Sequence, residues 1–106
     1  MKVVFLQSAR TDLQELRRKP ITRFGSQAWR EALARIQREV GQLESFPHKG
    51  SIPPELAELG APNYRQIVSG MCRIIYEIND QTISIHLVVD TRRDLKDVLA
   101  KRLLRP

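Results

Sequence analysis

Residues 64–99 read YRQIVSGMCRIIYEINDQTISIHLVVDTRRDLKDVL, and this stretch decides the fold. Apolar residues alternate with other residues along 72–78 and again along 83–89, with the period of two that a half-buried strand requires. The last strand is expected to carry Ile83, Ile85, Leu87 and Val89 on one face, and Ser84 and His86 on the other. Ser69-Gly70 and residues 79–81 are turn signals. The stretch therefore predicts an antiparallel meander of three strands.

The first turn sets the register between the first two strands. A two-residue turn at Ser69-Gly70 would place Arg65 opposite Ile74 on the core-facing side, where an unpaired charge is costly. A three-residue loop over residues 69–71 opposes Arg65 to Ile75 and puts it on the same face as Arg73. We expect the longer loop, and with it a shared face for Arg65 and Arg73.

The N-terminal part predicts one strand and two helices. Residues 3–6 are a short, continuously apolar run typical of a strand covered on both faces, which should pair with the meander. Ser8 is placed as the N-cap of a first helix that ends at or before Pro20. Gly25-Ser26 opens a second helix. Its apolar stripe is Ala28, Trp29, Ala32, Leu33, Ile36, Val40 and Leu43. The two helices predict an αα-hairpin.

Residues 46–63 hold four prolines and two glycines, so only 54–59 can form a helical turn. After the meander, Thr91 and Asp94 match a capping box, which predicts a last helix from about Arg92 to Leu104. Leu95, Val98, Leu99 and Leu103 give it an apolar edge. We expect an α+β fold of order β-α-α-β-β-β-α, in which the αα-hairpin packs on a four-stranded, mainly antiparallel sheet and a short basic helix ends the chain.

Composition limits what this fold can do. With 106 residues, 42% of them hydrophobic, the chain is expected to form a single domain over residues 1–106. It carries 18 Lys and Arg against 12 Asp and Glu, a formal charge of +6, so the expected partner is acidic, either nucleic acid or an acidic protein segment. The lone Cys72 is expected to be a buried, inert thiol. No apolar run approaches the roughly 20 residues of a membrane span, so a soluble, cytoplasmic protein without membrane contact is expected.

Catalytic and metal-binding patterns are weak. His48 and His86 have no partner at metal-ligand spacing, and there is no phosphate-binding glycine loop, so we expect neither metal nor cofactor. Arg65 and Arg73 can grip an anion or pair with a local acid such as Glu77, and both alternatives stay open. His86 is a candidate acid or base, or a structural residue of the strand.

The C-terminal segment, residues 91–106, is strongly basic. It has six basic residues and two acidic ones, a net charge of +4. The basic residues are Arg92, Arg93, Lys96, Lys101, Arg102 and Arg105. A solvated helix face and a contact surface for a partner explain this charge equally well.

Five segments stand out together: FLQSARTDL at 5–13, PPELAELG at 53–60, YRQI at 64–67, CRIIYEI at 72–78 and VVDTRRDL at 88–95. In their order and spacing they resemble the RelE/ParE superfamily, the small bacterial toxins of type II toxin–antitoxin systems. The resemblance covers nearly the whole chain. It implies two N-terminal helices against an antiparallel sheet, and an antitoxin whose acidic, partly disordered segment wraps the toxin. DNA would then be contacted only through the antitoxin.

The superfamily has two branches with different activities. RelE-like members cut messenger RNA on the ribosome, and ParE-like members inhibit DNA gyrase. On the RelE pattern, Arg65, Arg73 and Arg93 match basic site positions, and His86 is a weak further candidate. Two positions depart from that pattern, because a second strand Lys is replaced by Ile67 and the C-terminal Tyr by Leu99.

The ParE-like branch resembles this chain in keeping VVDTRRDL followed by a basic, leucine-rich end. We therefore expect a growth-arresting, plasmid-stabilising ParE-like toxin that binds gyrase through Arg92, Arg93, Lys96, Lys101, Arg102 and Arg105, with no catalytic residues. The alternatives are a RelE-like ribonuclease acting on ribosome-bound messenger RNA, and a non-toxic binding module of the same fold.

Overall fold

The computed structural model describes residues 1–58, 60 and 63–102, and the side chains of all of these except residues 19–24. The elements follow the expected order: β1 (Lys2–Phe5), α1 (Gln7–Phe24), α2 (Ser26–Gly41), a short 3₁₀ turn η1 (Gln42–Glu44), α3 (Pro54–Glu58), β2 (Tyr64–Ser69), β3 (Cys72–Asn79), β4 (Thr82–Asp90) and α4 (Leu95–Arg102). The expected α+β class is confirmed, and α3 is the helical turn expected in the proline-rich stretch.

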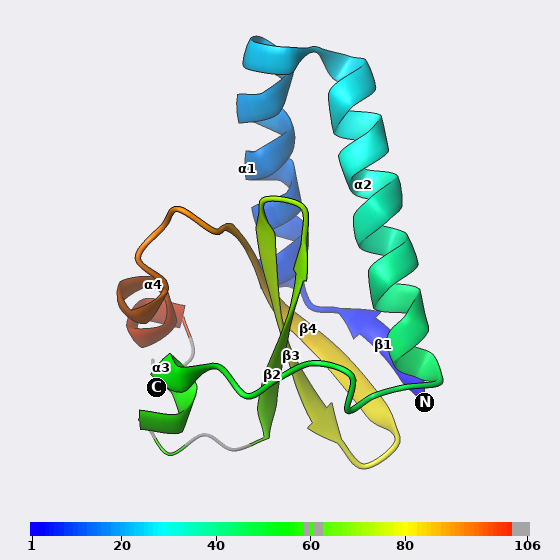
Figure 1. The fold of residues 1–106 in the computed structure, drawn as a ribbon, viewed down its shortest axis with the longest axis vertical. Helices are drawn as coiled ribbons and strands as arrows, with labels where there is room; N and C mark the ends of the chain where they lie inside the picture. Colours follow the sequence, from blue (N-terminus) through cyan, green and yellow to red (C-terminus); the bar gives the residue numbers. More distant parts are fainter. Residues whose placement is uncertain (59, 61–62, 103–106) are drawn as a thin grey trace.

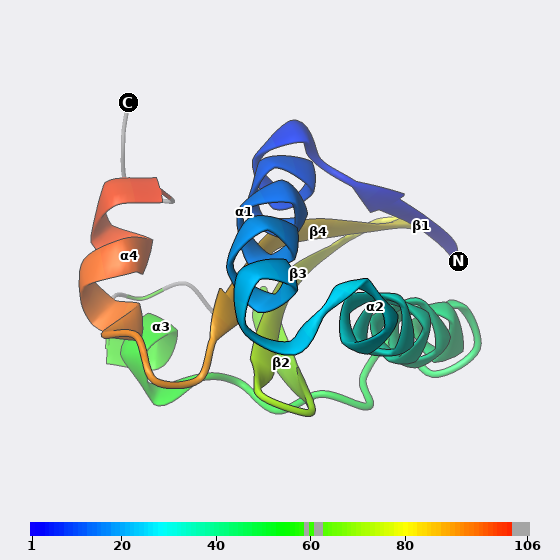
Figure 2. The ribbon, with the colours of Figure 1, turned by 90° about the horizontal axis from the view of Figure 1, so that it is seen from above.

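The four strands form one mixed sheet of order β1-β4-β3-β2. β2, β3 and β4 make the antiparallel meander, and β1 pairs with β4 in parallel, from Lys2 opposite Thr82 to Phe5 opposite Ile85. β1 is thus a half-buried edge strand and is not enclosed as expected. The α1–α2 hairpin covers one face of the sheet, while α3 and α4 lie side by side away from α2 (Figures 1 and 2).

The apolar residues of β4 are divided between the two faces by a β-bulge. Ile75 pairs with Leu87 but Tyr76 pairs with Ile85, which leaves His86 as an extra residue. Because an extra residue reverses the alternation of side chains, Ile83 and Ile85 pack under the helical hairpin whereas Leu87 and Val89 pack with α3 and α4. The expected single face for these four residues is therefore wrong, and the protein has two apolar clusters on opposite sides of one sheet.

The first cluster joins the sheet to the helical hairpin. Its buried side chains are Ala9, Ile36, Val40, Leu43, Ile67, Ile74, Tyr76, Ile83, Ile85 and Val88. The stripe expected on the second helix supplies three of them, and its Trp29 is also buried. The second cluster is formed by Leu56, Ile75, Leu87, Val89, Leu95, Val98 and Leu99. The apolar edge expected for the last helix is confirmed at its three described positions, and Leu103 lies outside the described residues.

Two expected boundaries of the first helix are wrong. α1 begins at Gln7, and Ser8 is no N-cap, because its hydroxyl donates to the carbonyl of His86 at 2.9 Å. The helix also continues past Pro20 to Phe24. A proline removes one backbone donor, a local loss that does not break the helix here. The chain reverses instead at Gly25, whose φ of 88° lies in the left-handed region that glycine adopts at no steric cost.

The last helix begins three residues later than expected. α4 starts at Leu95, and the Asp94 carboxylate accepts from the amide of Asp97 at 3.4 Å, so Asp94 takes the capping position expected for Thr91. Arg92 lies in the preceding turn, where its amide donates to Asp90 at 2.8 Å. The expected end at Leu104 lies outside the described residues.

The hairpin register also differs from the expected one. Ser69 pairs with Cys72 across a two-residue loop of Gly70 and Met71, so Arg65 lies opposite Tyr76. The loop is one residue shorter than the expected loop over 69–71, and it begins one residue later, at Gly70, whose φ is 60°. Residues directly opposite each other share a face, and Tyr76 belongs to the cluster under the helical hairpin, so Arg65 lies on the side of that hairpin. The expected shared face for Arg65 and Arg73 is wrong.

Candidate functional site

The sheet arginines do not form a common anion site. The Nη1 of Arg65 donates to the carbonyl of Gly50 at 2.7 Å, on the face of the α1–α2 hairpin. Arg73 lies opposite Val68 on the other face. A single phosphate or carboxylate therefore cannot contact both guanidinium groups, because the sheet separates them.

The charge of Arg73 is paired within the protein. Its guanidinium makes a two-point contact with the Glu55 carboxylate of α3, with both N–O distances at 3.2 Å. It also donates twice to the Gln66 side-chain oxygen, at 2.8 and 2.6 Å. Such fork-shaped contacts are strong and directional. Arg73 thus ties α3 to the β2–β3 hairpin, and its partner is Glu55 where the sequence suggested Glu77.

His86 lies in a separate polar cluster. Its Nε2 is 2.8 Å from the Glu77 carboxylate, and its ring meets Tyr64 edge-on at a centroid distance of 5.1 Å. Burial and the nearby Glu77 charge raise the pKa of Tyr64, so its hydroxyl stays protonated at neutral pH. Arg73 bonds to Glu55 and Gln66 whereas His86 bonds to Glu77, so the hydrogen bonds of the described residues give His86 and Arg73 no common polar partner.

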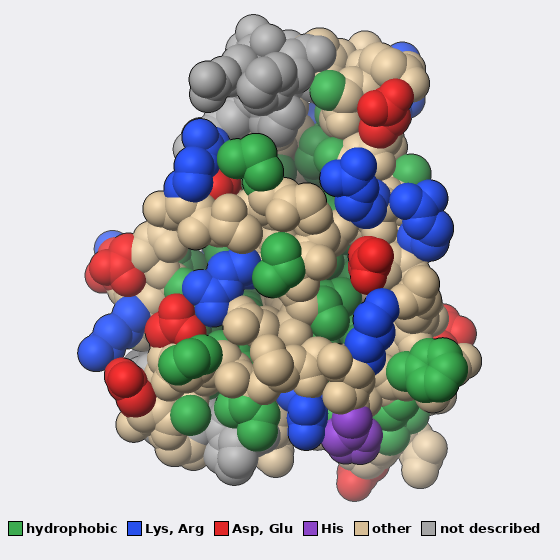
Figure 3. All heavy atoms as spheres, viewed as in Figure 1, with side chains coloured by type: hydrophobic (Ala, Val, Ile, Leu, Met, Phe, Trp, Pro, Cys, Tyr) green, Lys and Arg blue, Asp and Glu red, His purple; other side chains and the backbone are tan. Residues whose placement is uncertain are grey.

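The C-terminal segment presents several cations to solvent. Arg93 is exposed. Arg92, Lys96 and Lys101 form ion pairs with Asp90, Glu58 and Asp97, yet each of these three basic side chains remains about two-thirds exposed. Basic and acidic side chains alternate over this part of the surface, at the left of Figure 3. Arg102 differs, since it turns inward to Asp12, and Arg105 lies outside the described residues.

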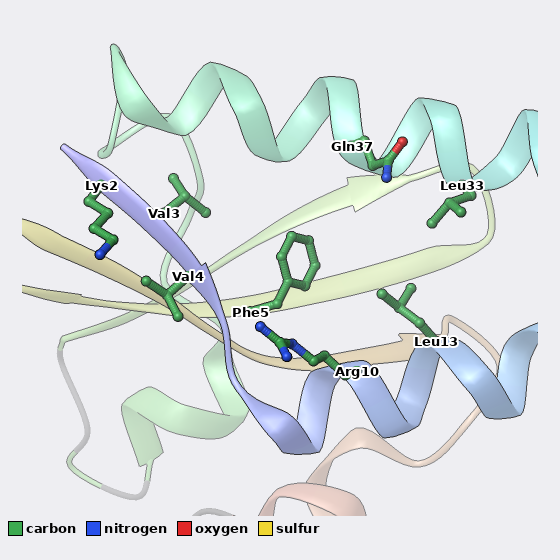
Figure 4. Close-up of a pocket in the computed structure, with 8 residues that line it drawn as sticks. All are labelled: Lys2, Val3, Val4, Phe5, Arg10, Leu13, Leu33 and Gln37. Carbon is green, nitrogen blue, oxygen red and sulfur yellow. The ribbon is translucent and has the colours of Figure 1, made fainter.

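A groove on the opposite side of the molecule was not expected from the sequence. β1, α1 and α2 enclose a cavity of about 500 Å³, with Val3, Phe5, Leu13 and Leu33 supplying most of its apolar lining. Figure 4 shows Phe5 reaching from β1 toward the space between the two helices. The other described lining residues are Lys2, Val4, Arg10 and Gln37, so the described part of the lining has two cations and no acid.

The outer edge of β1 borders this groove. The amide of Lys2 donates to the carbonyl of Gln81, just before β4, and that of Leu6 to the carbonyl of Ile85 in β4. By alternation, the backbone groups of Val3 and Phe5 point away from the sheet. In the part of the chain that the structure describes, no strand pairs with this edge. An open strand edge beside an apolar, basic groove is suited to an acidic, partly apolar peptide segment.

Two features are absent from the described residues. Among residues 1–58, 60 and 63–102, no three His, Cys, Asp or Glu side chains are grouped as metal ligands would be. None of the helices described is long and apolar enough to cross a membrane.

The Arg73–Glu55 contact gives a stability prediction. The hydrogen bond from Arg73 lowers the pKa of the Glu55 carboxyl. A carboxyl whose pKa is lower in the folded state stabilises the fold at pH values above its unfolded pKa of about 4.3. This stabilisation is lost as pH falls through the folded pKa. In urea unfolding, Arg73→Met should therefore lose stability at pH 7, and its deficit relative to wild type should shrink below about pH 4.

The matched control is Lys96→Met, which removes the exposed Lys96–Glu58 pair. It should cost about 0–1 kcal/mol at pH 7, as exposed ion pairs do. A deficit for Arg73→Met that stays constant down to pH 3 would contradict the assigned role of the contact.

Comparisons with known proteins bear on the family. Residues 3–95 match the family model described as ParE toxin of type II toxin-antitoxin system, parDE. No relative was found among curated proteins. The chain is similar to a solved structure described as the chromosomal ParDE TA system from P. aeruginosa, with a TM-score of 0.70 and 16% identity over 85% of this chain and 95% of that chain. The likeness in structure shows a common fold, and the match over 3–95 shows that the chain belongs to the ParE toxin family of type II toxin–antitoxin systems.

Proposed function

We propose that this chain arrests growth by binding DNA gyrase in the cytoplasm, without cleaving RNA, and that an acidic antitoxin neutralises it. The observation that carries the proposal is the separation of Arg65 from Arg73 by the sheet, together with the pairing of Arg73 with Glu55. Cleavage of RNA by its own 2′-hydroxyl needs a base and cations converging on one phosphate. Arg65 and Arg73 lie on opposite faces of the sheet and do not converge in this way, which supports an activity that depends on binding.

Two buried side chains support the same proposal. Ile67 and Leu99 occupy the positions where the ribonuclease branch is expected to have a Lys and a Tyr. Ile67 belongs to the cluster under the helical hairpin, and Leu99 to the cluster with α3. Both side chains are aliphatic and buried, so neither carries charge or donates a proton at a site.

We propose that the basic C-terminal surface binds the target. Arg92, Arg93, Lys96 and Lys101 are exposed on or just before α4, and Arg105 adds charge beyond the described residues. The local ion pairs of this surface are solvated and therefore weak, so an acidic protein partner can replace them at little cost. This surface supports binding of a folded, acidic protein region, and gyrase is the proposed partner.

We propose that the antitoxin binds in the groove between β1, α1 and α2. Its apolar floor provides the burial that a segment needs in order to fold on binding, and Lys2 and Arg10 provide charge complementarity to an acidic segment. The free edge of β1 adds backbone partners for an extended strand. Neutralisation and target binding then use different surfaces of the chain.

A supercoiling assay tests the target. Wild type should inhibit gyrase, and the double variant Arg93→Glu/Lys101→Glu should need about tenfold more protein for equal inhibition, because reversed charges repel an acidic partner. Deleting residues 101–106 should abolish inhibition. The matched control is Arg30→Glu/Arg38→Glu, which makes the same charge change on exposed positions of α2. Equal losses in the control pair and the C-terminal pair would argue against a localised surface.

Antitoxin binding tests the groove. Arg10→Glu should weaken binding of the antitoxin encoded beside this gene by about tenfold in calorimetry, since an acidic side chain then faces an acidic segment. Arg18→Glu on the same helix is the control, as Arg18 is exposed and does not line the groove. If Arg10→Glu binds as tightly as Arg18→Glu, the antitoxin docks elsewhere.

A further inference from the structure

β4 is longer than the strand that pairs with its outer edge. β1 ends at Phe5, opposite Ile85, so within the described part of the chain no strand lies beside the following residues of β4 on that edge. The beginning of α1 takes the place of the missing strand. The amide of Leu6 donates to the carbonyl of Ile85 at 3.1 Å, and the hydroxyl of Ser8 donates to the carbonyl of His86 at 2.9 Å. One turn later along α1, Asp12 continues this series.

Asp12 links three elements. Its Oδ2 accepts from the amide of Val88 in β4 at 3.0 Å. Its two oxygens also accept from Arg102 at the end of α4, Oδ1 from Nη1 at 2.9 Å and Oδ2 from Nη2 at 3.1 Å. The Asp12 side chain is only 12% exposed. Asp12 thus accepts a hydrogen bond from the Val88 amide and a forked contact from Arg102, which is 90 residues away in the sequence. These contacts make Asp12 a structural joint of α1, β4 and α4.

Arg102 thereby differs from the other cations of the C-terminal segment. Lys96 and Lys101 are 65% and 70% exposed, whereas Arg102 is 31% exposed and makes a third contact, 3.5 Å from Nη2 to the carbonyl of His86. Among the described residues, this is the ion pair that joins α4 to α1. The apolar side chains Leu95, Val98 and Leu99 hold the rest of α4 against the sheet.

We propose that Asp12 is a positioning residue, which fixes the C-terminal end of α4 through Arg102 and thereby sets the orientation of the basic C-terminal surface toward its target. The effect of Asp12 on target binding rests on the proposed function, whereas the contact between Asp12 and Arg102 does not. Arg102, included above among the expected target-binding residues, then acts as an anchor. Asp12, which no sequence pattern singled out for this task, becomes necessary for activity without touching the target.

Hydrogen–deuterium exchange of the full chain tests the joint, with Asp12→Asn and Arg102→Gln as variants. Asn keeps an oxygen for the Val88 amide but removes the charge that holds Arg102, and Arg102→Gln leaves Asp12 in place. In both variants the amides of 98–102 should exchange about fivefold faster than in wild type, while those of β3 are unchanged. The double variant should exchange no faster than either single variant, because both remove the same contact.

Two matched variants sharpen this experiment. Glu58→Gln removes the exposed Lys96–Glu58 pair of the same helix and should leave exchange of 98–102 unchanged. Arg102→Lys keeps the charge but loses the fork, so it should restore only part of the protection. Unchanged exchange in both Asp12→Asn and Arg102→Gln, or an equal increase in Glu58→Gln, would overturn the proposed joint.

Gyrase inhibition by the same proteins tests the consequence. Asp12→Asn should inhibit about fivefold less well than wild type, and Glu58→Gln at least as well as wild type. If wild type inhibits and Asp12→Asn inhibits equally despite faster exchange, Asp12 is not a positioning residue for target binding. If wild type itself fails to inhibit gyrase, the proposed function fails, and the exchange data still decide whether Asp12 holds α4.

Discussion

The extra residue in β4 at His86 is the constraint on which the rest of the structure depends. Because it reverses the alternation of side chains, Ile85 faces the helical hairpin while Leu87 and Val89 face the other way. The second face of the sheet thereby becomes apolar enough to bind α3 and α4. A regular β4 would have placed all four apolar residues under the hairpin and left α4 without a surface to pack on.

Three of the arginines illustrate how the basic excess is distributed. Arg65 is bound to a backbone carbonyl, Arg73 to Glu55, and Arg102 to Asp12, so all three have structural tasks. The charge that remains for partners lies on exposed helix surfaces and on the C-terminal segment. In the proposed function, a chain with a charge of +6 attracts acidic partners on two sides although its described sheet arginines do not converge on one anion.

Element types and order were predictable because they depend on local patterns. The stripe of α2, the alternation in β3 and the polar turn before β4 each lie within one segment. The bulge was not predictable, since His86 fits the polar phase of a regular strand equally well. Likewise, Thr91 and Asp94 are both good caps by residue type, and the sequence alone does not show that Asp94 takes this position.

The candidate site was less predictable than the fold, because its contacts join distant segments. The partner of Arg73 is 18 residues away on α3, and that of Arg102 is 90 residues away on α1. A shift of one residue in the β2–β3 loop moved Arg65 to the opposite face. The groove is built from three elements, and its only local signals are an apolar first strand and Leu33 on the stripe of α2.

We propose that this protein acts by binding a protein target and not by cleaving RNA. The most direct measurement maps the 5′ ends of a messenger RNA in a translating extract, at protein concentrations that inhibit gyrase in parallel reactions. The account predicts no new 5′ ends at any codon. New ends that appear with wild type and vanish with Arg73→Ala, in a variant shown to be folded, would contradict it.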